Sequence, residues 1–140
     1  LSRDPLGLFI CKGAFTLFKI LLIMKDFKKL EIWSRGMELA DLVYDVIDDI
    51  PWQKGQKVID QMSSASLSIP SNIAEGNSRR SEKDKHRFIE YALGSAFELE
   101  TQLIFSARRE WSTVQKIDRA LELCRTEQKM LMSFMDVLEK

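Results

Sequence analysis

A repeat of mostly apolar residues at alternating spacings of four and three runs almost to the end of the chain. Its members are Ile117, Leu121, Cys124, Gln128, Leu131, Met135 and Leu138. This spacing places them on one stripe of an α-helix, and such a stripe must be buried against neighbouring helices. The segment 24–140 contains no stretch in which apolar and polar residues alternate, so we expect no sheet there. The pattern therefore predicts an all-α protein.

The first predicted helix is apolar on two neighbouring stripes. One stripe is formed by Leu30, Trp33, Met37, Ala40, Tyr44 and Ile47, and the other by Ile32, Leu39, Val43, Val46 and Ile50. So wide an apolar arc is expected of a helix that packs on more than one neighbour. We expect this helix to span residues 27–50, with Asp26 as its N-cap and Pro51 as its end, and to be followed by a turn at 52–55.

A second helix is predicted over residues 54–75, with Gly76 as its C-cap. Pro70 lies inside it. Because proline lacks a backbone N–H, we expect a kink there or a division of the helix near residues 66–69. Five serines lie on two edges of this helix: Ser63, Ser64, Ser66, Ser68 and Ser71. They fit either a close approach of helices, within the bundle or between subunits, or a solvated face.

The segment from Ser81 to Asp84 resembles a capping box, and the third helix that it opens is predicted to reach Arg108. This helix also has two stripes, namely Phe88, Tyr91, Ser95, Leu99 and Gln102, and Ala92, Ala96, Leu99 and Leu103. Gly94 in its middle costs about 1 kcal/mol relative to alanine, which close packing on another helix would offset. A second capping-box pattern at 112–115 predicts the start of a fourth helix. Four helices joined by short turns predict an antiparallel up-down four-helix bundle.

The segment before Met24 is far more apolar than the rest of the chain. A membrane span there would have to take in Lys12 and Lys19, which is costly. Our preferred interpretation is that Met24 is the true start, and that residues 1–23 are an extension translated from a misplaced or non-AUG start. A membrane anchor and an extra docking helix are the alternatives. The four-helix-bundle domain is then 24–140.

The sequence offers no recognised catalytic or cofactor-binding pattern. His86 is its single histidine, and Glu82 stands four residues before it, which is not the Glu-x-x-His spacing of a di-iron bundle. There is no Gly-rich phosphate loop, no Cys-x-x-Cys and no His-Glu-x-x-His motif. Cys11 and Cys124 lack metal-ligand spacing and fit a reducing cytoplasm without disulfides. We therefore expect no enzymatic activity, no cofactor and no metal.

A charged run at the predicted start of the third helix is the candidate ligand-facing patch. Its cations, Arg79, Arg80, Lys83 and Arg87, could together contact the phosphates of RNA or DNA. The alternative is a solvated helix start, in which acidic neighbours face the positive end of the helix and partly neutralise the cations. The net charge of the chain is zero, which gives no strong steering toward nucleic acid. A ring of subunits would repeat the patch around an axis and strengthen its field.

A set of short motifs follows in a fixed order: Ser68-Ile69-Pro70-Ser71-Asn72-Ile73-Ala74-Glu75-Gly76, Arg80-x-x-x-Asp84, Ala92-Leu93-Gly94-Ser95 and Glu98-x-Glu100. Over residues 25–138 the chain resembles the proteins encoded by intervening sequences of bacterial 23S ribosomal RNA genes, whose relatives include accessory proteins of diversity-generating retroelements. The resemblance implies a four-helix bundle that assembles as a homopentameric ring, with no known catalytic activity. It also suggests binding of RNA, DNA or a reverse transcriptase. Ser63-Ser64 departs from the family, where a pair of arginines is common.

The resemblance assigns single residues to two structural motifs. Ser68, Pro70, Ser71, Asn72, Glu75 and Gly76 would form the family's kinked segment, and Gly94, Ser95 and Glu98 a second motif. We expect the kinked segment to shape a helix junction and a subunit interface, with Arg80 as a charge-assisted partner of Asn72 or Glu75.

Two functional hypotheses follow. One is a cytoplasmic, non-enzymatic, oligomeric adaptor for nucleic acid or for an enzyme that acts on it, and the other is a structural or protein-interaction module with no nucleic-acid partner. They differ in the salt dependence of binding, because phosphate contacts weaken steeply as salt rises. A third, remote class is membrane association through residues 6–24, and we do not expect it.

Overall fold

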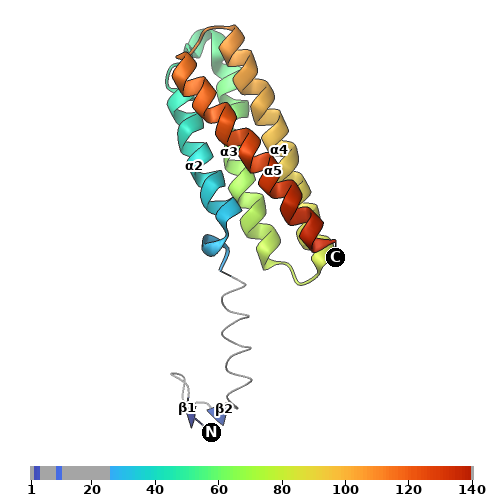
Figure 1. The fold of residues 1–140 in the computed structure, drawn as a ribbon. Coiled ribbons are helices and arrows are strands. Elements are labelled where there is room, and N and C mark those ends of the chain that lie inside the picture. Colours follow the sequence, from blue (N-terminus) through green and yellow to red (C-terminus); the bar gives the residue numbers. More distant parts are fainter. Residues whose placement is uncertain (1, 4–8, 11–25, 140) are drawn as a thin grey trace.

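The computed structural model describes residues 2–3, 9–10 and 26–139. Four long helices dominate it: α2 (Glu31–Ile47), α3 (Trp52–Ser78), α4 (Glu82–Arg108) and α5 (Val114–Leu138). A short 3-10 helix, η1 (Phe27–Lys29), precedes them, and two antiparallel two-residue strands lie near the N-terminus, β1 (Ser2–Arg3) and β2 (Phe9–Ile10). The predicted all-α four-helix bundle is confirmed (Figure 1).

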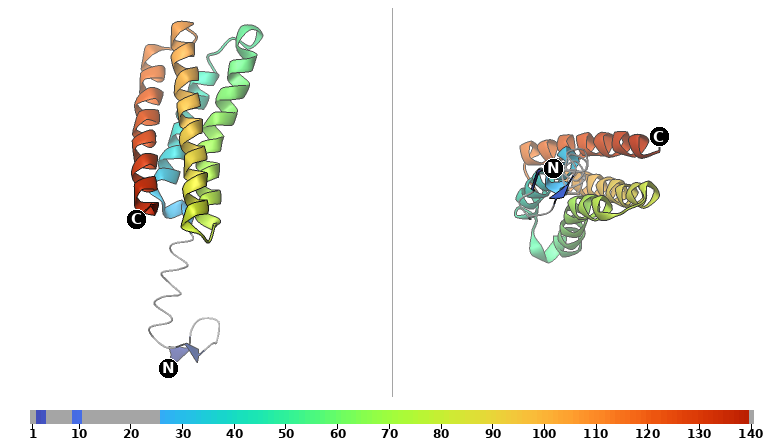
Figure 2. Two further views of the ribbon diagram at one scale, coloured as in Figure 1. Left: turned by 90° about the vertical axis from the view of Figure 1, so that its right-hand side faces the viewer. Right: turned by 90° about the horizontal axis from the view of Figure 1, so that it is seen from below.

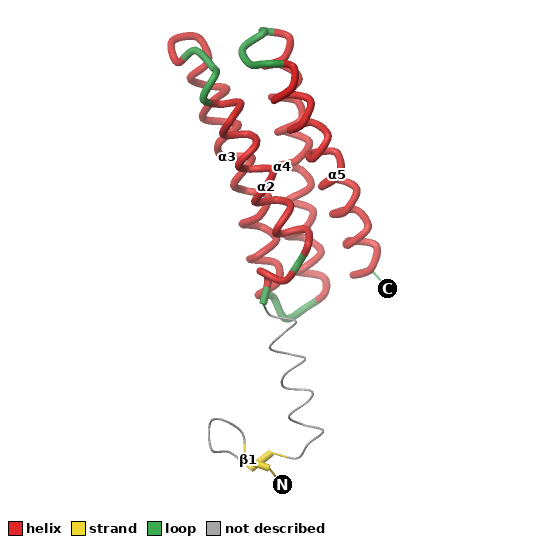
Figure 3. Tube along the Cα trace, turned by 60° about the vertical axis from the view of Figure 1, so that its left-hand side comes forward, coloured by secondary structure: helices red, strands yellow, loops and turns green. Residues whose placement is uncertain are grey.

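The helices run alternately up and down, so that neighbours in sequence are neighbours in space. α3 packs between α2 and α4, and α5 packs against α4 and closes the bundle on α2. Figure 3 shows the α2–α3 and α4–α5 turns together at one end of the bundle and the α3–α4 turn at the other. Seen from the side of α4, that helix lies between α5 and α3, and α2 lies behind them (Figure 2). The interior of the bundle is filled by apolar side chains, among them Leu39, Met62, Ile69, Leu99 and Leu131.

The structure distinguishes the two apolar stripes of the first and third predicted helices. In α2, Ile32, Leu39, Val43 and Val46 are buried, while Met37 and Tyr44 of the other stripe are about two-fifths exposed. In α4 the stripe of Ala92, Ala96, Leu99 and Leu103 faces the core, and Tyr91 is exposed. Two stripes are apolar in each helix, and the single chain buries one of them fully.

The first helix is shorter than predicted. Asp26 does act as an N-cap, but it caps η1: its side chain accepts a hydrogen bond from the Lys28 N–H at 3.2 Å. Leu30 is extended and separates η1 from α2, which ends at Ile47. The predicted single span over 27–50 is therefore wrong, because the backbone changes direction once before the long helix begins.

The predicted turn at 52–55 is also wrong, since α3 begins at Trp52 directly after Pro51. Proline at a helix start costs nothing, because its missing N–H would have no partner there. Gly55 lies in the first turn of α3 and is buried against the end of the preceding helix. A Cβ on Gly55 would lie 2.1 Å from Cγ2 of Ile50. The glycine therefore serves close packing and does not form a turn.

Helix α3 continues through Pro70 without interruption, so it is not divided near residues 66–69. Gly76 is not its C-cap: the helix runs on to Ser78 and Arg79 caps it. Gly76 is buried, and a Cβ there would lie 2.9 Å from Cβ of Phe88. It allows α3 to approach α4 closely. From sequence alone, a glycine that is needed for close packing cannot be told from a glycine that ends a helix.

The start of the third predicted helix is confirmed, because the Ser81 hydroxyl accepts from the Asp84 N–H at 3.1 Å. The fourth helix is capped one residue later than its capping-box pattern suggests, by Thr113, which accepts from the Lys116 N–H at 3.3 Å. The expected close packing of Gly94 is wrong for the single chain. Gly94 is exposed, and no heavy atom lies within 4 Å of a Cβ built on it.

The predictions for residues 1–23 fall on a segment of which the structure describes only β1 and β2, so the upstream extension, the anchor and the docking helix lie outside the described residues. In the described part of the chain, no helix combines the length and the apolar character that a membrane crossing requires.

Candidate functional site

The two main motifs meet where α3 packs on α4. The hydroxyls of Ser68 and Ser95 are 2.9 Å apart, and either oxygen can be the donor. The amide of Asn72 donates to the Ser68 carbonyl at 2.8 Å and to the Ser68 hydroxyl at 2.9 Å. We call Ser68, Asn72 and Ser95 the polar seam. It joins two helices with half-buried hydrogen bonds, which fix the register of one helix on the other.

The other motif residues are divided between the core and the surface. Pro70 and Gly76 are buried, whereas Ser71, Glu75, Gly94 and Glu98 are exposed. These four lie on the outer side of α3 and α4, away from the bundle interior. Some of the motif residues therefore pack in the core, and the others form part of the protein surface.

Arg79 takes the position expected of Arg80. Its guanidinium donates to Glu75 at 2.8 Å and also lies 4.6 Å from the ring centre of Phe88. Within residues 26–139, Arg80 makes no ion pair, and Asn72 is held by Ser68 alone. Arg80 is thus exposed and available to a ligand, while Arg79 is engaged.

The outward side of α4 carries large apolar side chains beside these polar motif residues. Tyr91 is 52% exposed, Phe97 49% and Phe105 46%, and Ile104 is exposed as well. Leu67 of α3 is also 46% exposed, but it lies on another side of the bundle, nearer to Pro70 than to the residues that contact α4. We call the four exposed apolar residues of α4, together with Gly94, the outer face. Exposed aromatic groups gathered on one side of a small domain are typical of a protein–protein interface.

The charged run is largely neutralised within the chain. Arg87 pairs with Asp84, and Lys85 pairs with Glu82 at 3.0 Å. The hydrogen bond with Ser81, followed by the contact with Arg87, lowers the pKa of Asp84. Lys83, like Arg80, is exposed and makes no ion pair with any described residue. Two of the four predicted phosphate-binding cations therefore remain free in the single chain.

Among the described residues, the polar partners of His86 are carboxylates, and none is a serine or a cysteine. Its Nε2 is 2.9 Å from Glu139 and its Nδ1 is 3.7 Å from Glu90, so carboxylates flank both ring nitrogens. Burial raises the pKa of the Cys124 thiol to about 12, which keeps it out of the reactive thiolate form. Over residues 26–139 no cluster of three or more histidine, cysteine, aspartate or glutamate side chains is arranged to hold a metal ion.

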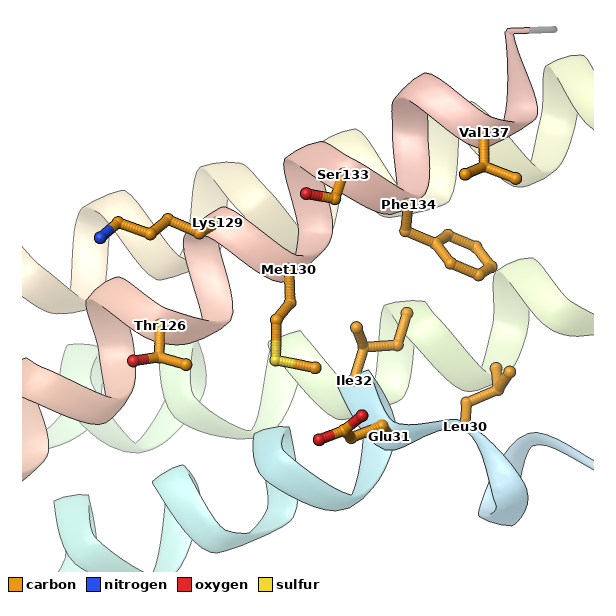
Figure 4. Close-up of a pocket in the computed structure, with 9 residues that line it drawn as sticks. All are labelled: Leu30, Glu31, Ile32, Thr126, Lys129, Met130, Ser133, Phe134 and Val137. Atoms are coloured by element: carbon orange, nitrogen blue, oxygen red, sulfur yellow. The ribbon is translucent and has the colours of Figure 1, made fainter.

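An apolar groove of about 470 Å³ lies between the start of α2 and the second half of α5. Figure 4 shows Met130 and Phe134 of α5 extending toward Ile32 of α2 and Leu30, which directly precedes that helix. Its ionisable groups are Glu31, which is held by Arg35 at 3.1 Å, and Lys129. A second cavity of about 300 Å³ shares Leu30 and Phe134 with the groove. The ionisable groups that line this second cavity, Glu82 and Lys85, are paired with each other at 3.0 Å.

Sequence reasoning missed Glu127, a fully buried residue of α5. Burial raises its pKa to about 8, and neither carboxylate oxygen has a hydrogen-bond partner among the described residues. The sequence does contain a signal of its burial: Glu127 stands three residues after Cys124 and four before Leu131, a spacing that places it on the buried side of the helix. The stripe read from sequence passed through Gln128, one residue away.

The fold and these surfaces define a class: an antiparallel four-helix bundle with a polar seam between α3 and α4 and an exposed apolar face on α4, without a recognisable catalytic centre in its described part. The family described as 23S rRNA-intervening sequence protein matches residues 28–133, and the chain belongs to this family. A comparison with curated proteins gives no match.

A solved structure has the same fold. It is the 1.70 Å crystal structure of a protein of unknown function from the S23 ribosomal protein family of Bacteroides thetaiotaomicron VPI-5482. The two chains are 22% identical, the alignment covers 74% of this chain and 97% of the other, and the TM-score is 0.66. This likeness supports the bundle architecture.

Proposed function

We propose that this protein is a non-enzymatic adaptor that assembles into a homo-oligomer through its outer face and acts in the cytoplasm on nucleic acid or on a reverse transcriptase. The observation that carries the proposal is the group of large apolar side chains that the single chain leaves exposed on the outward side of α4, Tyr91, Phe97 and Phe105 among them. Side chains of this size on a solvated helix favour burial against another surface. The family resemblance suggests that the surface is another copy and that the ring has five members.

Gly94 supports the same interface. An exposed glycine in the middle of a helix costs about 1 kcal/mol relative to alanine and gains nothing in the single chain. It lies one helical turn from both Tyr91 and Glu98, in the middle of the outer face. A neighbouring subunit that packs closely there would need the missing side chain.

The interface has a direct test in sedimentation velocity of the full chain. Replacing Tyr91 and Phe97 together by serine is expected to reduce the oligomer to the mass of one chain, because both rings lose their burial. The matched control is Val114→Ser, which removes an exposed apolar side chain outside the outer face. An unchanged mass for the double variant, with its helical circular dichroism intact, would refute this interface.

The nucleic-acid part of the proposal rests on Arg80 and Lys83, the two cations of the charged run that make no ion pair within residues 26–139. A ring would bring several copies of them around one axis and strengthen the local field. Binding of a labelled single-stranded RNA should weaken steeply with salt, and Arg80→Ala with Lys83→Ala should flatten that dependence. Arg119→Ala with Lys129→Ala, two exposed cations of α5, is the control for net charge.

The second candidate is a protein-interaction module without a nucleic-acid partner. It is favoured by the pairing of Arg79 with Glu75 and of Arg87 with Asp84, which leaves little free positive charge. Under this alternative the oligomer still forms, and RNA binding is absent or insensitive to salt. The RNA titration therefore separates the two candidates.

A further inference from the structure

Three helices of the bundle meet around the carboxyl group of Glu127. Gly36 of α2 faces Pro70 of α3 and Glu127 of α5: a Cβ built on Gly36 would be 3.5 Å from Cβ of Pro70 and 3.6 Å from Oε1 of Glu127. Glu127 has no exposed surface, and both of its oxygens lack a hydrogen-bond partner among the described residues. A carboxyl group in this position is an anomaly, because buried polar groups in proteins are nearly always paired.

An ionised carboxylate at this position would raise the free energy of the folded state. Taking an unpaired charge out of water is so costly that a buried acid keeps its proton instead. Burial is the main cause that raises the pKa of Glu127 to about 8, and the charge of Arg35 opposes it only in part. Arg35 is already bonded to Glu31 at 3.1 Å. At neutral pH the group is therefore mostly a neutral acid, which carries one O–H donor.

The other charges around this part of the core do not supply a partner. α3 presents no ionisable residue between Ser63 and Ile73. On α4, Glu100 is held by Arg125 at 2.7 Å and by Gln128 at 2.7 Å. On α5 itself, Cys124 is a neutral buried thiol that bonds the Ala96 carbonyl at 3.3 Å.

Pro70 leaves a complementary gap in α3. In an uninterrupted helix, the N–H of residue 70 would donate to the carbonyl of Ser66, and proline has no N–H to give. Ser66 is fully buried, so water does not readily replace the missing donor. Its own hydroxyl is turned away, donating to the Ser63 carbonyl at 3.0 Å. The core thus contains an acceptor without a helical donor on α3 and an acid without an acceptor on α5, and both helices approach Gly36 of α2 there.

We propose that Glu127 acts as a proton-dependent latch: its carboxyl O–H donates to the α3 backbone at the carbonyl that Pro70 leaves open, and loss of that proton releases α3 from α2 and α5. The latch belongs to the core of the single chain and does not depend on the proposed function. It gives the proline inside α3 a structural role, since an unbroken helix would offer Glu127 no free acceptor.

The sign of the pH effect follows from the raised pKa. The folded state keeps a proton that the unfolded state gives up above the ordinary glutamate value of 4.5. Stability should therefore fall as the pH rises from that value and level off once the pH has passed about 8. Removal of the proton takes away the donor and places a charge in the core at the same time.

The test compares four variants of the full chain by urea unfolding between pH 5.5 and 9. In Glu127→Gln the amide keeps a donor and cannot ionise, and in Glu127→Met both the donor and the titration are lost. We expect both variants to lose the fall in stability with pH, and we expect the unfolding constant of Glu127→Met to be about fivefold larger than that of Glu127→Gln, as for one hydrogen bond. Adding Pro70→Ala to each restores the helical donor and should remove that difference.

Two results would refute the proposed role of Glu127 as a latch. One is a Glu127→Met variant as stable as Glu127→Gln when Pro70 is present, since the carboxyl would then have no acceptor. The other is a wild-type protein whose stability falls with pH no more than that of Glu127→Gln. If a variant fails to fold, infrared difference spectra of the wild-type protein decide the matter: the C=O stretch of a protonated carboxyl group must be present at pH 7 and lost by pH 9.

Discussion

The hydroxyl groups of Ser68 and Ser95 lie 2.9 Å apart across the boundary between α3 and α4. The two residues are 27 positions apart in sequence and belong to two of the short motifs that carry the family resemblance. Asn72 holds the same Ser68 hydroxyl at 2.9 Å, so the motif residues act as one hydrogen-bonded unit. This part of the sequence motif is thus explained by the way one helix is fixed against the next.

The polar seam should contribute measurably to stability. Ser68→Ala removes the partner of both Ser95 and the Asn72 amide, and we expect it to lower the free energy of unfolding by about 1–2 kcal/mol. Ser64→Ala, on the exposed side of the same helix, is the control and should change it by less than about 0.5 kcal/mol. Equal effects of the two substitutions in urea unfolding would show that the seam contributes nothing.

The two glycines on the α3–α4 side should respond in opposite ways when the protein is a monomer. Gly76→Ala places a methyl group 2.9 Å from Cβ of Phe88 and should destabilise the chain by about 1–3 kcal/mol. Gly94→Ala meets nothing within 4 Å and should stabilise the helix by about 1 kcal/mol in dilute, monomeric protein.

In the oligomer the prediction for Gly94 changes sign. If the outer face packs closely on another subunit, the added methyl group should weaken association, so that Gly94→Ala raises the dissociation constant while stabilising the monomer. Sedimentation velocity over a range of concentrations measures the first effect, and thermal unfolding at the lowest concentration measures the second. Stronger association of the alanine variant would argue against close packing at this position.

A surface ion pair joins the two turns at one end of the bundle. Lys116 donates to Asp49 at 2.8 Å, and Ser112 donates to the same carboxylate at 2.6 Å. The bond from Lys116, followed by that from Ser112, lowers the pKa of Asp49 below its ordinary value of 3.8. The same pairing raises the pKa of Lys116 above its ordinary value of 10.5.

Its contribution to stability should therefore depend on pH at both extremes. On the acid side it is present above pH 3.8 and is lost as the pH falls through the lowered pKa of Asp49. On the alkaline side it is present below 10.5 and is lost as the pH rises through the raised pKa of Lys116. Asp49→Asn should reduce the loss of stability between pH 5 and 2 in thermal scans, whereas Asp60→Asn, an exposed carboxylate of α3, should leave it unchanged.

The helices were predictable because each carries a continuous apolar stripe, and because two of them, α4 and α5, begin with a side chain that caps them. Ser81 shows this well, since its hydroxyl accepts the Asp84 N–H as the local sequence predicts. The boundaries around Leu30 and Pro51 were not predictable, because an extended residue between two helical segments leaves the apolar spacing unchanged. Local patterns thus define which segments are helical better than where they bend.

The surroundings of single residues were predicted less well, for reasons of tertiary packing. Gly76 read as a helix end and is instead the place where α3 approaches α4. Gly94 read as a close contact and is exposed in the single chain. Glu127 was missed from sequence, because only the rotation of α5 toward α2 and Pro70 buries it. For such helices the periodicity indicates two faces that could be buried, and the contacts between helices determine which one is.

The most direct test of the proposed function is the native mass of the full-length protein, purified from its own cells at low salt and measured before and after nuclease treatment. An oligomer that loses mass with nuclease is the predicted result, and its bound nucleic acid should be released by Arg80→Ala with Lys83→Ala. An oligomer whose mass nuclease leaves unchanged would contradict the nucleic-acid role and favour the protein-interaction module. A single chain at every concentration would contradict the assembly itself.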